Sequence, residues 1–411
     1  MVLYQKKILD NGLTVIIHED PSTPLVAINV LYKVGSKDED PNKTGITHLF
    51  EHLMFSGSTN IPDFDDPIQL AGGENNAFTN TDITNFYNVL PAENIEIGLW
   101  LEADRMARLK LNNKSVATQK KVVIEEFKET CLNEPYGDVF HHLCEMAYDK
   151  HGYKWPTIGK DTSHIENISL EDTKNFYENF YGPHNAIIVL SGNILYEKGF
   201  ELAHKWFDNI DGKSKTNLKI DTVDYFQTSA SKIIHANVPS KAIYLAFKMN
   251  HRLHDEFYII DLLSDILSSG RSSRFYEKLI KEKQLFSFID AYITGTTDPG
   301  LLIIDGKLQE GVSIENAKEA IWNELENISN ILIEDRELVK IKNKAESNLI
   351  FSETSALNKS MSLAYYEYLE DIELINKEVD IYRNITSEQL IQCAKNLFQK
   401  EHCIELIYMP N

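Results

Sequence analysis

The sequence has few cysteines, fewer basic than acidic residues, and no long apolar run. Lysine and arginine number 41 against 62 acidic residues, a net charge of −21, which disfavours binding to nucleic acid. No stretch approaches the roughly 18–20 apolar residues of a membrane span. No CxxC pair occurs, which argues against a disulfide framework or a cysteine zinc site. The four cysteines are Cys131, Cys144, Cys393 and Cys403.

Residues 1–9 also lack the apolar core and small-residue cleavage site of a signal peptide. We therefore expect a cytoplasmic protein. A periplasmic or organellar protein is expected instead if the sequence is an already processed form, which would look the same.

The 411 residues are 43% hydrophobic, enough for packed cores, and their pattern is mixed α and β. Alternation and β-branched residues predict strands at residues 13–17 and 25–32, and a third strand at 77–90 that polar residues interrupt. Helical periods predict helices at residues 45–54, 92–110 and 115–133. The apolar-poor stretch 208–217 is typical of an interdomain linker.

The same order of elements recurs after this linker, which predicts a duplication. A helical stretch opened by Ser169 leads into the apolar strand 186–190, and 217 residues later a stretch opened by Thr386 leads into 403–407. In both copies the hydroxyl residue is placed to cap its helix. We therefore expect two similar domains.

One motif carries recognisable chemistry. His48, Glu51 and His52 form an H-x-x-E-H pattern inside an apolar helical stretch. On a helix, residues four apart share a face, so the two imidazoles and the carboxylate converge. Such imidazole pairs bind Zn²⁺, and a non-ligating carboxylate takes a proton from the activated water. With 13 His and 62 acidic residues, the pattern is expected roughly 0.06 times by chance.

A catalytic zinc site needs a third protein ligand. The helix predicted around residues 119–129 offers Glu126, which shares the apolar face of Val122 and Val123. Glu125 and Glu129 compete for the role, and spacing alone does not decide among the three glutamates.

Taken together, these residues resemble the M16 metallopeptidases, the superfamily of pitrilysin and the mitochondrial processing peptidase, in the form of a short M16B-type subunit. H-x-x-E-H is followed about 75 residues later by a glutamate in a V-V-x-x-E helix. The match spans most of the first half and is more diffuse in the second, where 272–276 is clearest. The supporting segments are residues 11–15, 35–36, 44–45, 57–58, 72–79, 155–159 and 181–186.

The resemblance implies an α+β fold of two duplicated M16-type domains, each a mostly antiparallel mixed sheet with helices packed on it. We place these domains at residues 1–215 and 216–411. It also implies a zinc-dependent metalloendopeptidase acting on peptides or short unfolded segments. Zn²⁺ would be held by His48, His52 and Glu126, with Glu51 as the general base.

The family further implies that the segment Asn76, Ala77, Phe78 and Thr79 is an edge strand that binds an extended peptide substrate through main-chain hydrogen bonds. Without the family, an ordinary edge strand blunted by polar residues is the simpler interpretation. The family has a second glutamate seven residues before the third ligand, where this chain has Gln119. A second-shell role for Gln119 is therefore in doubt, because an amide supplies no charge.

A second departure concerns partners. Where family members that bind substrate with their C-terminal half carry an arginine and, seven residues later, a tyrosine, this chain has Ile280 and Ser287. Tyr292 or Arg271 would substitute only after a local shift in alignment. The resemblance thus implies the zinc-holding subunit of a heterodimer whose second M16 subunit carries the Arg/Tyr pair, and a homodimer stays possible. The alternative is a non-catalytic scaffold subunit of the same fold.

Overall fold

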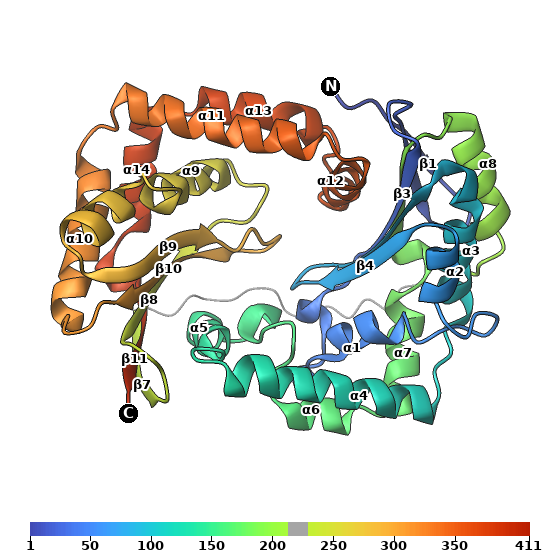
Figure 1. Ribbon diagram of the computed structural model, residues 1–411, viewed down its shortest axis with the longest axis horizontal. Helices are drawn as coiled ribbons and strands as arrows, with labels where there is room; N and C mark the ends of the chain where they lie inside the picture. Colours follow the sequence, from blue (N-terminus) through green and yellow to red (C-terminus); the bar gives the residue numbers. More distant parts are fainter. Residues whose placement is uncertain (213–228) are drawn as a thin grey trace. The chain divides into compact units, whose positions relative to one another are not determined.

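The computed structural model describes residues 1–212 and 229–411, so the expected boundary between residues 215 and 216 lies outside the described residues. The chain forms two compact units (Figure 1). The first comprises residues 1–129, 151–222 and 350–377, and the second comprises 130–150, 223–349 and 378–411. Each unit thus includes a segment from the other half of the sequence.

The first unit is built on a six-stranded sheet with the order β1-β2-β6-β3-β5-β4. Its strands are β1 (Gln5–Ile8), β2 (Thr14–Glu19), β3 (Leu25–Tyr32), β4 (Glu74–Thr79), β5 (Thr84–Pro91) and β6 (Ala186–Gly192). Its helices are α1 (Ile46–Leu53), α2 (Asp65–Leu70), α3 (Ile95–Arg108), α4 (Asn113–Phe127), α6 (Thr162–Asn167), α7 (Leu170–Phe180), α8 (Tyr196–Phe207) and α12 (Ala356–Tyr368).

The second unit is built on a five-stranded sheet with the order β7-β11-β8-β10-β9. Its strands are β7 (Ala230–Ala236), β8 (Ala242–Met249), β9 (Phe286–Ile293), β10 (Gly300–Leu308) and β11 (Ile404–Pro410). Its helices are α5 (Val139–Ala147), α9 (Glu256–Ser268), α10 (Ile314–Asn330) and α14 (Ser387–Leu397), and the chain passes between the units within α11 (Asp335–Ser352) and α13 (Leu374–Asn384).

The two sheets confirm the predicted duplication. Apart from β1, five strands follow one another in the same spatial order in each sheet, and the outer pair is parallel in both, β2 with β6 and β7 with β11. The remaining neighbours are antiparallel. Ser169 and Thr386 cap α7 and α14 by accepting the main-chain N–H groups of Asp172 and Gln389. The fold is therefore the expected pair of mostly antiparallel mixed sheets with packed helices.

One expected element was wrong. Residues 77–90 form a hairpin of two strands, β4 and β5, rather than one interrupted strand. The side chain of Asn80 accepts the main-chain N–H groups of Asp82 and Ile83, at 2.8 and 2.9 Å, and so closes the turn locally. The polar residues that seemed to interrupt a strand are its turn.

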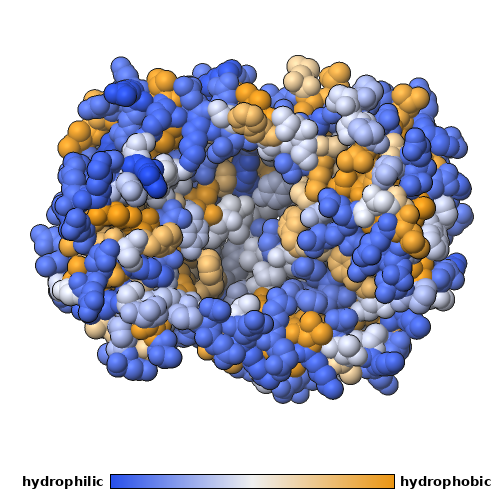
Figure 2. Space-filling model, in the orientation of Figure 1, coloured by the Kyte–Doolittle hydropathy of each residue, from blue (hydrophilic) through white to orange (hydrophobic). Residues whose placement is uncertain are grey.

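Apolar burial holds each unit together. In the first sheet Val15, Ile28 and Leu190 are fully buried, and in the second Ile243 and Phe247 are. Hydrophilic residues cover most of the visible surface, with apolar residues in small groups (Figure 2). None of the helices in the described ranges combines the length and apolar character of a membrane span.

Candidate metal centre

The helix that carries the H-x-x-E-H motif begins at a buried carboxylate. Glu39 is fully buried and accepts the main-chain N–H groups of Gly45 and Thr47, each at 2.8 Å, and the indole N–H of Trp155 at 3.1 Å. A carboxyl oxygen at a helix N-terminus accepts hydrogen bonds from main-chain N–H groups that have no partner within the helix. Gly45 has a φ of 88°, which favours glycine at this entry. Glu39 therefore fixes where α1 starts and which way its side chains point.

His48 and His52 lie one turn apart on α1, with ring centroids 5.0 Å apart. Both are partly buried, with side-chain exposures of 12% and 26%. Their Nε2 atoms converge on one carboxylate from α4, that of Glu126, at 3.7 Å from His48 and 3.4 Å from His52. The structure therefore brings together the three side chains that the sequence proposed as ligands.

The two competing glutamates lie elsewhere. Glu125 is exposed and forms an ion pair with Lys128 at 2.7 Å, and Glu129 is exposed just beyond α4. α4 packs against α1 and gives way after Phe127 to a π-helical stretch, Lys128–Asn133. Such irregular turns are frequent at functional sites. Glu126 is thus the one of the three that faces the imidazoles.

This donor set fits a zinc ion. With bonds of about 2.0–2.1 Å, the ligand atoms of tetrahedral zinc lie about 3.3 Å apart, close to the two observed Nε2-to-carboxylate distances. Burial lowers the pKa of His48, and the hydrogen bond from His52 lowers the pKa of Glu126. A neutral imidazole and an ionised carboxylate are the forms that bind a metal.

Glu51 lies on the same helix but makes a different contact. Its carboxylate accepts a hydrogen bond from the hydroxyl of Thr79, the last residue of β4, at 2.6 Å. The expected general base is therefore held by the strand that the resemblance proposed for substrate binding.

β4 is an edge strand, as the order of the sheet shows. It pairs with β5 on one side, and among the described residues no strand pairs with its other side. Asn76 and Phe78 are exposed, whereas Ala77 and Thr79 are half-buried on the face toward α1. The four proposed substrate residues therefore lie on an open strand edge next to the helix that carries the two histidines.

Two sequence patterns of one family match this chain. The pattern described as "Insulinase (Peptidase family M16)" matches residues 14–161, and the pattern described as "Peptidase M16 inactive domain" matches residues 167–345. The chain belongs to peptidase family M16. The histidines, Glu51 and Glu126 all lie in the stretch matched by the first pattern, and the "inactive domain" stretch contains none of them.

Individual relatives agree with this assignment. Zinc protease PqqE of Helicobacter pylori is 28% identical over 98% of this chain and 92% of its own length. Uncharacterized zinc protease YmxG of Bacillus subtilis is 23% identical over 97% and 96%. The crystal structure of a protease from Helicobacter pylori has a TM-score of 0.93, at 26% identity, over the full length of both chains.

Gln119, at the position of the second M16 glutamate, reaches the ligand helix through one intermediary. Its amide Nε2 donates to the hydroxyl of Ser56 at 2.9 Å, and that hydroxyl donates to the main-chain carbonyl of His52 at 3.2 Å. Gln119 is therefore linked through Ser56 to the main-chain carbonyl of His52.

Ile280 and Ser287, which the sequence aligns with the M16 Arg/Tyr pair, make structural contacts within the second unit. Ile280 lies in a π-helical stretch, Tyr276–Glu282, and packs against the core of the second unit. The hydroxyl of Ser287 donates to the main-chain carbonyl of Lys307 at 3.2 Å. Tyr292 lies on β9 and Arg271 in an exposed loop.

Sequence reasoning missed Glu39 and Ser56. Neither belongs to a local motif. Glu39 lies six and eight residues before Gly45 and Thr47, and its contact with Trp155 joins residues 116 apart in the chain. The only signal available was an acidic residue six positions before Gly45, which is common on protein surfaces.

Glu39 makes stability depend on pH. Burial raises its pKa from an ordinary 4.5 to about 8, against the opposing hydrogen bonds from Thr47, Gly45 and Trp155. Between these values the unfolded chain releases a proton that the folded chain retains, so this group's contribution to stability falls as pH rises from about 5 to 8. We expect the unfolding free energy of Glu39→Gln, measured by urea unfolding, to fall less steeply with rising pH than that of the parent. Glu93→Gln, at an exposed position, is the control, and equal slopes for parent and Glu39→Gln would refute this role.

Proposed function

We propose that the protein is a zinc-dependent endopeptidase that cleaves peptides or short unfolded segments. The observation that carries the proposal is the convergence of His48, His52 and Glu126, with Glu51 on the same helix and an open strand edge beside it. The names of the M16 relatives, several of them zinc proteases, support it at the level of the family.

In this mechanism the chain's own residues bind, orient and transfer protons. A zinc ion, when bound, supplies Lewis acidity that polarises a carbonyl and acidifies water. His48, His52 and Glu126 would hold that ion. Glu51 accepts the proton of the attacking water and returns it to the leaving amine. Its carboxylate is oriented for this by the Thr79 hydroxyl.

The substrate is proposed to add to β4 as a further strand. Main-chain groups of residues 76–79 would pair with an extended peptide, which requires a segment not already paired in a folded structure. We therefore expect a preference for flexible peptides over folded proteins.

The contact between Thr79 and Glu51 makes a testable prediction. Thr79→Val keeps the shape of the side chain but removes the donor to a charged group, which contributes about 1.5–3 kcal/mol. We expect kcat to fall about 10-fold or more, with KM unchanged, because the carboxylate loses the group that orients it. Thr81→Val, in the turn after β4, is the matched control. A kcat equal to the parent's would refute the positioning role.

We further propose that a second M16 subunit supplies the Arg/Tyr pair. Ile280 and Ser287 offer neither a cation nor a phenol, and both are engaged within the second unit. The experiment is to assay a mixed peptide library with the chain alone and with candidate partner subunits, each with and without a chelator. Chelator-sensitive cleavage that appears only in the mixture supports both proposals, whereas full activity of the lone chain would contradict the need for a partner.

The rival is a non-catalytic scaffold, and the same assay separates it. A scaffold would show no chelator-sensitive cleavage in any mixture and would bind no stoichiometric zinc.

A further inference from the structure

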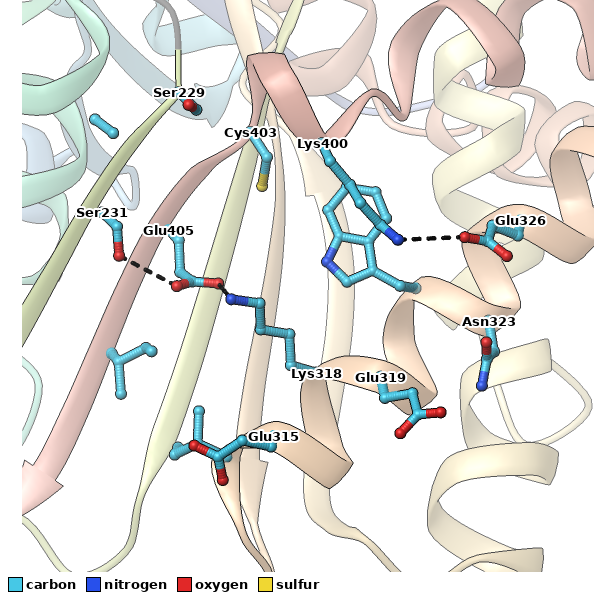
Figure 3. A pocket seen from close by; sticks show the side chains of 14 residues that line it. Ser229, Ser231, Glu315, Lys318, Glu319, Asn323, Glu326, Lys400, Cys403 and Glu405 are labelled. Atoms are coloured by element: carbon cyan, nitrogen blue, oxygen red, sulfur yellow. Dashed lines mark hydrogen bonds and ion pairs between the residues drawn. The ribbon is translucent and has the colours of Figure 1, made fainter.

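The second unit has an open groove of about 880 Å³ beside α10 (Figure 3). It is lined by residues of β7, β11 and α10 and by Lys400. The duplication gives each of these strands and helices a counterpart in the first unit. β7 and β11 correspond to β2 and β6, and α10, which follows β10, corresponds to α3, which follows β5.

In the first unit a helix lies over the corresponding elements. α8 packs on β2 and contacts α3. Its buried face presents Gly199, Phe200, Leu202, Ala203 and Phe207. In the described part of the second unit, β11 is the last helix or strand, and the groove lies where α8 lies in the first unit.

Equivalent positions on β2 and β7 differ in how far their side chains are exposed. In the parallel pairs, Ile17 lies beside Leu190 and Ile233 beside Ile407. Ile17 is fully buried, and Gly199 of α8 approaches it so closely that a Cβ there would lie 2.8 Å from the Ile17 side chain. Its counterpart Ile233 is 60% exposed. An apolar side chain that a helix covers in one unit is therefore uncovered in the other.

A glutamate at the start of α10 also has a counterpart in the first unit. α3 and α10 both begin with Ile-Glu, and the first of these glutamates, Glu96, forms an ion pair with Lys205 of α8 at 2.6 Å. Its counterpart Glu315 is exposed at the groove, and within the described ranges it forms no ion pair. A lysine of a docked helix would therefore find the same acidic partner in the second unit.

The basic residues of the groove are already engaged. Figure 3 shows Lys318 directed to Glu405 and Lys400 directed to Glu326, at 2.5 and 3.4 Å. Lys400 also lies over the ring of Trp322. The charge left at the rim is acidic, from Glu315 and Glu319, which favours a basic ligand face.

We propose that this groove docks an amphipathic helix of a partner protein, with a small residue over Ile233 and a lysine or arginine beside Glu315. The occupant resembles α8 in chemistry because the first unit shows that such a helix fits on these elements. The proposal concerns only the second unit and does not depend on zinc or on cleavage.

The probe is a fluorescent, end-capped peptide of residues 194–209, which contains α8. Its anisotropy is measured against the full chain carrying Glu51→Gln, so that the probe is not cut. We expect saturable binding, weakened about 10-fold by Ile233→Asp, since an exposed apolar side chain of β7, beside the groove residue Ile407, is replaced by a charge. Leu332→Asp is the matched control, because Leu332 is also 60% exposed but lies on neither β7 nor β11.

A charge exchange tests the second contact. Glu315→Lys should weaken binding of the peptide about 3-fold or more. A peptide carrying Lys205→Glu should regain that affinity on the Glu315→Lys protein and not on the protein that keeps Glu315. Glu334→Lys, at an exposed site elsewhere, should have no effect. Hydrogen exchange of β7 should slow when the peptide binds. Absence of saturable binding, or binding that neither groove substitution changes, would overturn the proposal.

Discussion

Replacing Glu51 by glutamine is expected to lower peptide cleavage about 10²–10⁴-fold, the usual contribution of a general base, while zinc stays bound. The amide keeps the size of the side chain and can still accept the hydrogen bond from Thr79, but it cannot take a proton from water. The proposed metal ligands His48, His52 and Glu126 are untouched. The measurement is kcat/KM on a peptide substrate together with the zinc content of the same preparation.

The control for this substitution is Glu125→Gln. Glu125 lies on α4 next to Glu126, but its side chain is 72% exposed and paired with Lys128. It should retain the parent rate. Cleavage by Glu51→Gln at the parent rate would show that the proton is transferred by another group.

Replacing Glu126 by alanine is expected to weaken zinc binding more than about 100-fold, beyond the loss typical of outer-shell substitutions. The substitution removes one of the three proposed protein ligands and the negative charge that faces both imidazoles. When zinc is limiting, the rate of peptide cleavage should fall together with the zinc affinity. Competition against a chromophoric chelator measures the affinity directly.

Glu129→Ala is the control, because Glu129 is exposed and follows the end of α4. Unchanged zinc affinity in Glu126→Ala would mean that the third ligand comes from elsewhere in the chain, and the proposed centre would have to be rebuilt.

Local patterns predicted much of this molecule. Helical spacing alone places His48 and His52 on one face of α1, and the repeated capping residues Ser169 and Thr386 predicted two copies of one strand order. These features depend on neighbours within four residues, which a sequence shows directly. The prediction of one strand over residues 77–90 was wrong because the side chain of Asn80 closes a turn that alternation does not reveal.

Long-range packing supplied the rest. Spacing left Glu125, Glu126 and Glu129 open, and the resemblance to M16 selected Glu126. The packing of α4 on α1 supplies the physical reason, since it brings Glu126 to the two imidazoles. The contacts of Thr79 with Glu51 and of Glu39 with α1 join different elements, so no local pattern predicts them. The same holds for α5 and α12, which pack on the sheet formed mainly by the other half of the sequence.

The central claim is that His48, His52 and Glu126 hold one zinc ion. The most direct test is zinc-edge X-ray absorption on the purified chain, with metal content measured on the same sample. We predict about one zinc per chain, with two imidazole nitrogens and carboxylate or water oxygen at about 2.0–2.2 Å. A chain that retains no zinc after reconstitution, or one whose zinc is bound by sulfur, would contradict the account.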